Sequence, residues 1–284
     1  MSTSAAELTV GRPRRGRIGT VFETIGVAVG QRRLIWYLAV SSLRKRGTDS
    51  LLGNLWWVLD PALQMGVYYV LVGIILNRSE PAYPLFLFAA ILPWKWFSTC
   101  LADSTSSIRL REKVLRQIAF PQIVLPIATM TASLASFAFG LIPLLALYLF
   151  YPDRLTAWIL LLPVVAAVQL LWTLPFAVLL SASNVFFRDV GNLVGHLLRL
   201  WFYLSPGLFS VERIREIADR HPPLSLLVDA NPFTWLFGAY RDVLYYGRAP
   251  DWVVLGVLAL ASLPVSFVAI HIFRRVSPSF VKVL

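Results

Sequence analysis

The feature that most constrains this chain is a pair of long stretches, 121–150 and 155–183, that contain no Asp, Glu, Lys or Arg. About 20 predominantly apolar residues cross the hydrocarbon core of a bilayer, so each stretch predicts a membrane-spanning helix. Charged residues make up only 14% of the chain, against roughly 25% in soluble domains. We therefore expect an all-α integral membrane protein with six transmembrane helices. The remaining candidate spans are 51–76, 83–107, 191–210 and 252–273.

The basic residues predict how the chain is oriented. The net charge is +11, and Lys and Arg concentrate before the first span, in the loop 108–120 and in the tail 274–284. Because cytoplasmic loops are enriched in Lys and Arg, we expect both termini in the cytoplasm and a single transmembrane domain over 51–273. In a chain this apolar, the positive charge indicates a membrane surface and not a nucleic acid.

The segment before the first span divides into two parts. Residues 1–20 are polar and basic and predict a disordered tail, whereas 21–46 carries a short apolar run between basic pairs. Such a run suits an amphipathic helix lying in the cytoplasmic interface, with Arg32, Arg33 and Trp36 among the lipid headgroups. The alternative is an undistinguished flank of the first span.

The loop 108–120 combines apolar and charged residues. Ile108, Val114, Leu115 and Ile118 alternate with charges at helical spacing, which predicts a short amphipathic helix on the cytoplasmic face. The alternative is a solvated basic loop. Its charged residues are Arg109, Arg111, Glu112, Lys113 and Arg116.

The outer loop 211–250 is the longest between predicted spans and contains Pro222, Pro223 and Pro232. It is apolar between these prolines, which predicts two short helices broken at Asn231–Pro232 that re-enter the membrane from outside. Polar backbone at such a break is tolerated only against protein or a water-filled cavity, so we expect an outer gate over a pore. Its candidate residues are Asn231, Pro232, Phe233, Trp235 and Arg241.

Aromatic residues are frequent, at 13%. Many are expected in the interfacial belts, but Trp and Tyr also offer flat faces with a polar edge, on which a sugar ring can stack. An arginine inside a span is a functional candidate by default, although it can also snorkel. The candidate substrate-path residues are Trp56, Trp57, Tyr68, Tyr69, Trp96, Phe97, Arg199, Trp201 and Tyr203.

The sequence carries no sign of chemistry of its own. It has no phosphate-binding P-loop, and its three histidines lie far apart without metal-ligand spacing. The carboxylates available for catalysis in the inner half of the predicted membrane domain lie on separate segments and form no paired motif. They are Asp49, Asp60 and Asp103. We therefore predict no enzyme activity, no metal and no cofactor in this chain.

Five further motifs occur in order along the chain. They are Ser50-Leu51-Leu52-Gly53-Asn54-Leu55-Trp56-Trp57 with Asp60-Pro61, Phe120-Pro121 with Leu125-Pro126, Asn184-Val185-Phe186-Phe187-Arg188-Asp189, Tyr203-Leu204-Ser205-Pro206, and Asn231-Pro232-Phe233-Thr234 with Arg241. Together they resemble a known family, the permease subunits of polysaccharide-exporting ABC transporters (the Wzm and TagG group). The resemblance runs from about residue 30 to the C-terminus.

The resemblance implies a homodimeric permease in the bacterial inner membrane, with two copies of a separate ATPase docked on 108–120 and on the N-terminal helix. ATP and Mg²⁺ would then bind to the partner, and the substrate would be a lipid-linked polysaccharide such as O antigen, teichoic acid or a cell-wall glycan. One alternative is an ABC exporter for drugs or single lipids, which would need no aromatic lining. A membrane-embedded glycosyl or acyl transferase would need catalytic carboxylates or histidines gathered at one membrane face.

Overall fold

The computed structural model describes the chain except residues 1–25, 28, 49–51, 78–79, 119 and 219–221. The predicted tail 1–20 and the first residues of the predicted interface helix lie outside the described residues. Among the described residues every regular element is helical, which confirms the all-α prediction.

Five helices are long and apolar enough to cross a membrane. Each corresponds to one of the predicted spans, and their ends differ from the prediction by a few residues except at the last, which continues to Val283. The five are α3 with its π-helical continuation η2 (Trp56–Ile75), α4 (Tyr83–Ser106), α6 (Val124–Tyr148), the 3-10 turn η5 with α7 (Ala157–Phe186), and α12 (Trp252–Val276) with its continuation to Val283.

The predicted span 191–210 is represented by α8, Val190–Tyr203, which has 14 residues. A helix of this length rises about 21 Å, less than the hydrocarbon core of about 30 Å. Residues 204–210 continue as turns because Pro206 and Gly207 follow the helix end. The sixth span therefore stays a prediction.

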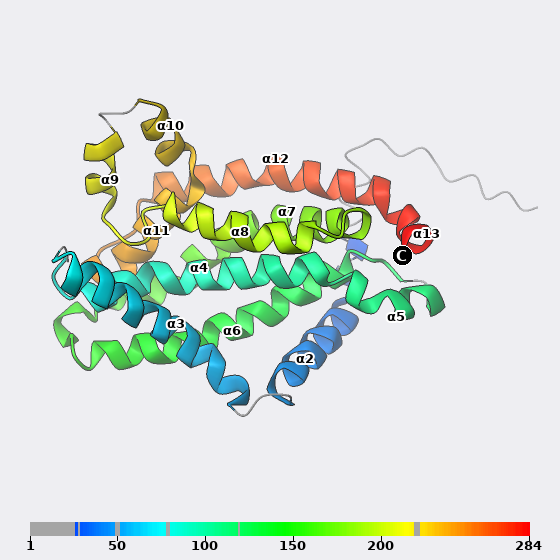
Figure 1. Ribbon diagram of the computed structural model, residues 1–284, viewed down its shortest axis with the longest axis horizontal. Helices are drawn as coiled ribbons and strands as arrows, with labels where there is room; N and C mark the ends of the chain where they lie inside the picture. Colours follow the sequence, from blue (N-terminus) through cyan, green and yellow to red (C-terminus); the bar gives the residue numbers. More distant parts are fainter. Residues whose placement is uncertain (1–25, 28, 49–51, 78–79, 119, 219–221) are drawn as a thin grey trace, which may run out of the picture.

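Most of the shorter helices lie at the two ends of the bundle (Figure 1). At one end lie α5 and α13, together with the C-terminus, and at the other end lie α9 and α10, whereas α2 lies along the side of the bundle against α6. The bounds are α2 (Arg32–Thr48), α5 (Glu112–Gln117), α13 (Phe280–Val283), α9 (Val211–Ala218), α10 (Pro222–Ala230) and α11 (Pro232–Arg241).

The core of the molecule is built around α4, which packs against α3, α6, α7, α8 and α11. Its side chains Phe86, Phe88 and Phe97 are fully buried. Polar contacts also tie α4 to α7, since the Gln169 amide donates to the Pro93 carbonyl at 2.8 Å and the Asn184 amide to the Thr105 carbonyl at 2.9 Å. These bonds satisfy polar groups that would otherwise be costly inside a membrane.

Candidate functional site

The predicted amphipathic helix at 108–120 is interrupted. A 3-10 turn, Arg109–Arg111, precedes the six-residue helix α5, and Arg111 between them leaves helical geometry. Consequently only Ile108 and Leu115 point into the apolar core, whereas Val114 and Ile118 are 44% and 60% exposed. The segment therefore contains a shorter helix than predicted, with apolar side chains both in the core and on the surface.

The charged residues of this loop differ in their contacts. The Arg111 guanidinium donates to the Ser42 hydroxyl of α2 at 2.9 Å, and burial lowers its pKa. Arg116 and Glu112 form an ion pair at 3.0 Å, one turn apart on α5. Arg111 thus joins the loop to α2, and Lys113 is exposed.

The exposed apolar side chains Leu110, Val114 and Ile118 line a cavity of about 620 Å³ between this loop and α2. Leu34 and Leu38 of α2 line its other side. Of the predicted interface residues, Arg32, Arg33 and Trp36 are all exposed, and Trp36 is 66% exposed. The loop and α2 together form one surface at this end of the bundle.

A polar groove runs between α3, α4 and α8, with a volume of about 500 Å³. At its centre Lys95 of α4 and Asp60 of α3 form an ion pair at 2.6 Å, and Arg199 of α8 lines the same groove. Ionisable residues at membrane depth are costly and normally face the protein interior or a water-filled cavity. We call this feature the polar groove; its other polar lining residues are Gln64, Ser98 and Thr99.

On the other side of the ion pair lies a smaller cavity of about 180 Å³ between α3, α4 and α6. It is lined by Trp56, Trp57, Trp96 and Ser136, among others. The Ser136 hydroxyl, like the Gln64 carbonyl oxygen in the polar groove, is buried without a hydrogen-bond partner among the described residues.

Asp60, Gln64 and Lys95 are absent from the predicted substrate-path residues. The signal that could have found them is one carboxylate and one amine, each isolated in a separate predicted span. Spacing along one helix cannot reveal such a pair, because its members meet only when α3 packs on α4.

The predicted substrate-path residues separate into two groups. Trp56, Tyr69 and Tyr203 have exposed rings, Arg199 is also exposed, and the Tyr68 and Tyr203 hydroxyls lie 3.4 Å apart. By contrast, Trp96 and Phe97 are buried within the chain, while Trp57 and Trp201 are half-buried. The proposed stacking role is a prediction for all of these residues.

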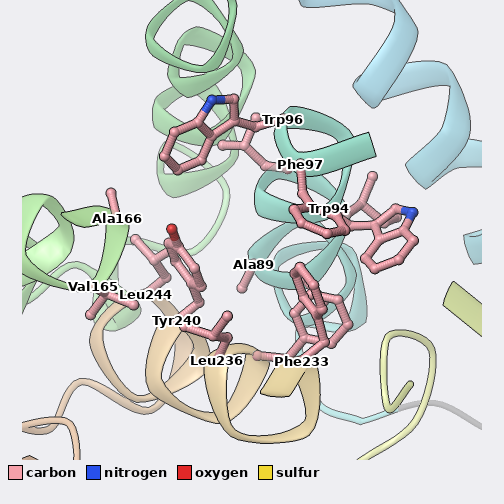
Figure 2. Close-up of a cluster of buried hydrophobic side chains, with 14 of the residues drawn as sticks. Ala89, Trp94, Trp96, Phe97, Val165, Ala166, Phe233, Leu236, Tyr240 and Leu244 are labelled. Atoms are coloured by element: carbon pink, nitrogen blue, oxygen red, sulfur yellow. The ribbon is translucent and has the colours of Figure 1, made fainter. Parts of the chain in front are cut away.

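Figure 2 shows the aromatic side chains that surround Phe97. Phe97 and Trp94 of α4 point toward Phe233 of α11, with ring centroids 4.5 and 4.8 Å from the Phe233 ring. Trp201 of α8 completes this cluster at 5.6 Å from Phe233. The cluster fixes α11 against α4 and α8, and aromatic pairs at these distances stabilise such contacts.

The break at Asn231–Pro232 is the N-terminus of α11. The Asn231 side-chain oxygen accepts from the Phe233 backbone N–H and from the Trp201 indole, both at 3.0 Å, and its amide donates to Ser205 at 2.7 Å. Pro232 occupies the first helical position, where its missing N–H costs nothing. The polar break therefore lies against protein, as the sequence analysis expects.

Arg241 ends α11 and is 2% exposed. Its guanidinium donates to the Gly207 carbonyl at 2.8 Å and to the Phe209 carbonyl at 3.2 Å, and lies 3.7 Å from the ring centroid of Phe86. An arginine side chain stays charged even when it is buried. Arg241 thus holds the turn after α8 against α4.

The two helices of the predicted gate are unlike each other. In α10, Leu226 and Leu227 are 72% and 60% exposed, whereas Phe233 and Phe237 of α11 are buried. Trp235 is half-buried, and its indole donates to the Asp229 carbonyl at 2.9 Å. Phe233 and Phe237 of α11 thus belong to the core, whereas Val228 is the one buried side chain among the described side chains of α10.

No cluster of three or more His, Cys, Asp or Glu side chains suited to a metal occurs in the described part of the chain. Five long apolar helices define a multi-pass α-helical membrane protein. Two of these helices are joined by the ion pair between Lys95 and Asp60. The identity of the protein comes from related sequences.

Comparison with known proteins gives a consistent result. No family model matches the chain. It is 35% identical over 251 residues to the O-antigen export system permease protein RfbA of Myxococcus xanthus, covering 88% of this chain and 95% of the relative. Two proteins of the same name from Klebsiella pneumoniae are 25% and 24% identical over the same shares. The chain therefore belongs to the family of O-antigen export permeases.

This membership confirms the resemblance to the Wzm-like permeases of ABC transporters. The relatives are named as permeases, which are transport subunits, so the prediction of a transport protein in place of an enzyme is confirmed. The chain is a multi-pass protein of the bacterial inner membrane.

Proposed function

We propose that this chain is the membrane-spanning subunit of an ATP-driven exporter that carries a lipid-linked polysaccharide, O antigen or a related glycan, out of the cytoplasm. The single observation that carries the proposal is the 35% identity to an O-antigen export permease over 88% of the chain. The polar groove supports it, because a hydrated polymer needs polar side chains at membrane depth.

The test is complementation. A strain whose own O-antigen permease gene is deleted, but which keeps its ATPase, should regain surface O antigen when this chain is expressed together with its cognate ATPase. Restored resistance to an unrelated drug without surface glycan would favour the alternative of a drug or single-lipid exporter. Transfer of sugar in the absence of an ATPase would favour the transferase.

We further propose that two copies assemble around the pore. Support comes from α3, in which only 11% of the apolar window is buried in the protomer. Leu63 and Val67 of α3 and Ile74 of its continuation η2 are 58%, 64% and 60% exposed. Single cysteines at these three positions should give a disulfide-linked dimer in native membranes. A cysteine at Leu260 of α12, equally exposed at 68%, serves as the lipid-facing control.

The proposed orientation has both termini and the 108–120 loop in the cytoplasm. This requires α8 to act as a short sixth span, with the buried helix α11 filling the remaining depth on the outer side. A cysteine at Lys113 should then react with an impermeant thiol reagent only after the cells are opened, and a cysteine at Leu226 should react in intact cells. The opposite labelling would reverse the orientation.

The surface formed by α2 and the 108–120 loop is the proposed docking site for the ATPase. Exposed Leu110, Val114 and Ile118, surrounded by charged residues, suit a partner with an apolar cleft and an acidic rim. Reversing the charges of Arg109, Lys113 and Arg116 should abolish copurification of the ATPase while membrane insertion is kept. Arg111 is left out because its bond to Ser42 makes it structural.

The stacking role is proposed for the exposed rings Trp56, Tyr69 and Tyr203. Replacing all three by Ala should slow polymer export, and replacing them by Phe, which keeps the ring face, should slow it less. A triple Ala variant that inserts normally and exports at the wild-type rate would refute stacking.

A further inference from the structure

An apolar groove separate from the polar groove lies between α2 and three spans. It has a volume of about 560 Å³ and shares no lining residue with the polar groove. Its walls are almost wholly carbon. Representative lining residues are Ile35 and Trp36 of α2, Ile127 and Thr131 of α6, Leu174 of α7 and Ile270 of α12.

The depth of the groove matches one leaflet of a bilayer. Along α6 its lining extends from Ile123, just before the helix begins, to Leu134. This part of the helix rises about 16 Å, close to half of the hydrocarbon core of about 30 Å. Its inner end on α7 is marked by Leu170 and Leu171, near the middle of that helix. The groove therefore covers the depth that a single acyl chain occupies.

The rim of the groove carries the opposite chemistry. Arg32 of α2 lines it, and a second, more polar cavity of about 400 Å³ adjoins it at Ile123. Gln122, Arg274 and Ser277 line that second cavity. The cytoplasmic leaflet contains anionic lipids, which attract basic side chains near the membrane surface. An apolar slot with a basic, hydrogen-bonding rim is complementary to an anionic phospholipid.

We propose that this groove binds one anionic glycerophospholipid of the cytoplasmic leaflet, with an acyl chain between α2 and α6 and the phosphate at Arg32. The lipid fills the apolar groove between α2 and the neighbouring spans. It thereby holds α2 against the bundle. The inference relies on the proposed orientation, in which α2 lies on the cytoplasmic side. It does not depend on the exported substrate.

The experiment measures lipid that stays bound. The full chain is reconstituted in nanodiscs containing phosphatidylglycerol and phosphatidylcholine, transferred to mild detergent and weighed by native mass spectrometry. Wild type should retain one phosphatidylglycerol per protomer. Arg32→Gln should reduce this retention at least threefold, whereas Arg33→Gln, its neighbour outside the groove lining, should change it less than twofold.

A second pair of variants tests the slot itself. Thr131→Trp places an indole in the groove and should also reduce retention at least threefold. Ile142→Trp, about three turns further along the same face of α6 and 52% exposed, is the matched control and should retain lipid as wild type does. Added phosphatidylglycerol should raise the unfolding temperature of wild type and of both controls, but not that of Arg32→Gln.

Several results would overturn the proposal. Equal loss in Arg32→Gln and Arg33→Gln would mean diffuse attraction without a site, and equal retention of phosphatidylcholine would remove the role of charge. Preferential binding of a polyprenyl-linked glycan would make the groove part of the substrate route. Retention that appears only after deletion of residues 1–20 would show that the tail is the occupant. Export is measured in parallel, so that failure of the proposed transport function is recognised separately.

Discussion

The neighbouring helices α3 and α4 have nearly the same mean hydropathy over their apolar windows, yet they differ in how much of each window is buried. In α4, 78% of the window is buried in the protomer, against 11% in α3. Figure 1 shows α4 between other helices of the bundle, with α3 at its edge. The comparison teaches that hydropathy identifies a span but does not tell which spans form the core of a membrane protein.

The largest expected effect on stability comes from comparing a buried residue of α4 with an exposed residue of α3. Phe97 of α4 is 0% exposed and contacts Phe233 and Trp201, so Phe97→Ala should destabilise the protein by about 4 kcal/mol. Leu63→Ala in α3, at an exposed position, should change stability by less than about 0.5 kcal/mol in the isolated protomer. Thermal unfolding in detergent measures both; equal losses would contradict the comparison.

The second prediction concerns Arg241, which attaches the turn after α8 to α4. Arg241→Met removes the donors to the Gly207 and Phe209 carbonyls and the charge over Phe86. Each buried carbonyl left without a donor costs about 1–3 kcal/mol, so we expect a loss of about 3 kcal/mol and protease sensitivity in 204–210. Arg241→Lys should lose less, because one ammonium donor can still reach a carbonyl. A stable, protease-resistant Arg241→Met variant would show that the turn needs no anchor.

The third prediction uses glycines. A Cβ added to Gly140 of α6 would overlap Cδ1 of Leu92 on α4, whereas none of the described residues lies within 4 Å of a Cβ added to Gly66 of α3. Gly140→Ala should therefore destabilise by about 1 kcal/mol, because the end of the Leu92 side chain must move, and Gly66→Ala should stabilise by up to about 1 kcal/mol through helix propensity. If Gly66→Ala is instead harmful in membranes, α3 packs closely against a partner at this position.

The smallest effect on stability is expected at the contact between the two helices. Lys95 and Asp60 have side chains 33% and 50% exposed, so Asp60→Asn should cost less than about 1 kcal/mol. Export should suffer more than stability, because an unpaired ammonium would stand in the polar groove. The exchange Asp60→Lys with Lys95→Asp restores the pair; recovery of export in that double variant checks the prediction, and failure to recover would assign each residue its own role.

The agreement between sequence and structure differs along the chain for identifiable reasons. The apolar stretches 121–150 and 155–183 predict α6 and α7 well because charge-free runs have no other stable solution in a bilayer. The start of α11 at Asn231–Pro232 is equally predictable from the sequence, because a capping residue followed by Pro at the first helical position marks a helix start. In 108–120 the helix is shorter than predicted, because a 3-10 turn takes up Arg109–Arg111. The helix α8 ends at Tyr203, and the segment 204–210, which contains Pro206 and Gly207, continues as turns.

The sequence by itself determined that this protein crosses a membrane as helices. Only helices and closed barrels satisfy all backbone groups in lipid, and the long apolar runs lack the alternation of barrel strands. It also determined the family, through motifs that keep their order along the chain. The tertiary structure alone decided that α4 is the core, that Trp96 and Phe97 are buried, and that Asp60 meets Lys95. These facts depend on which helix faces pack together, and residues far apart in sequence decide that packing jointly.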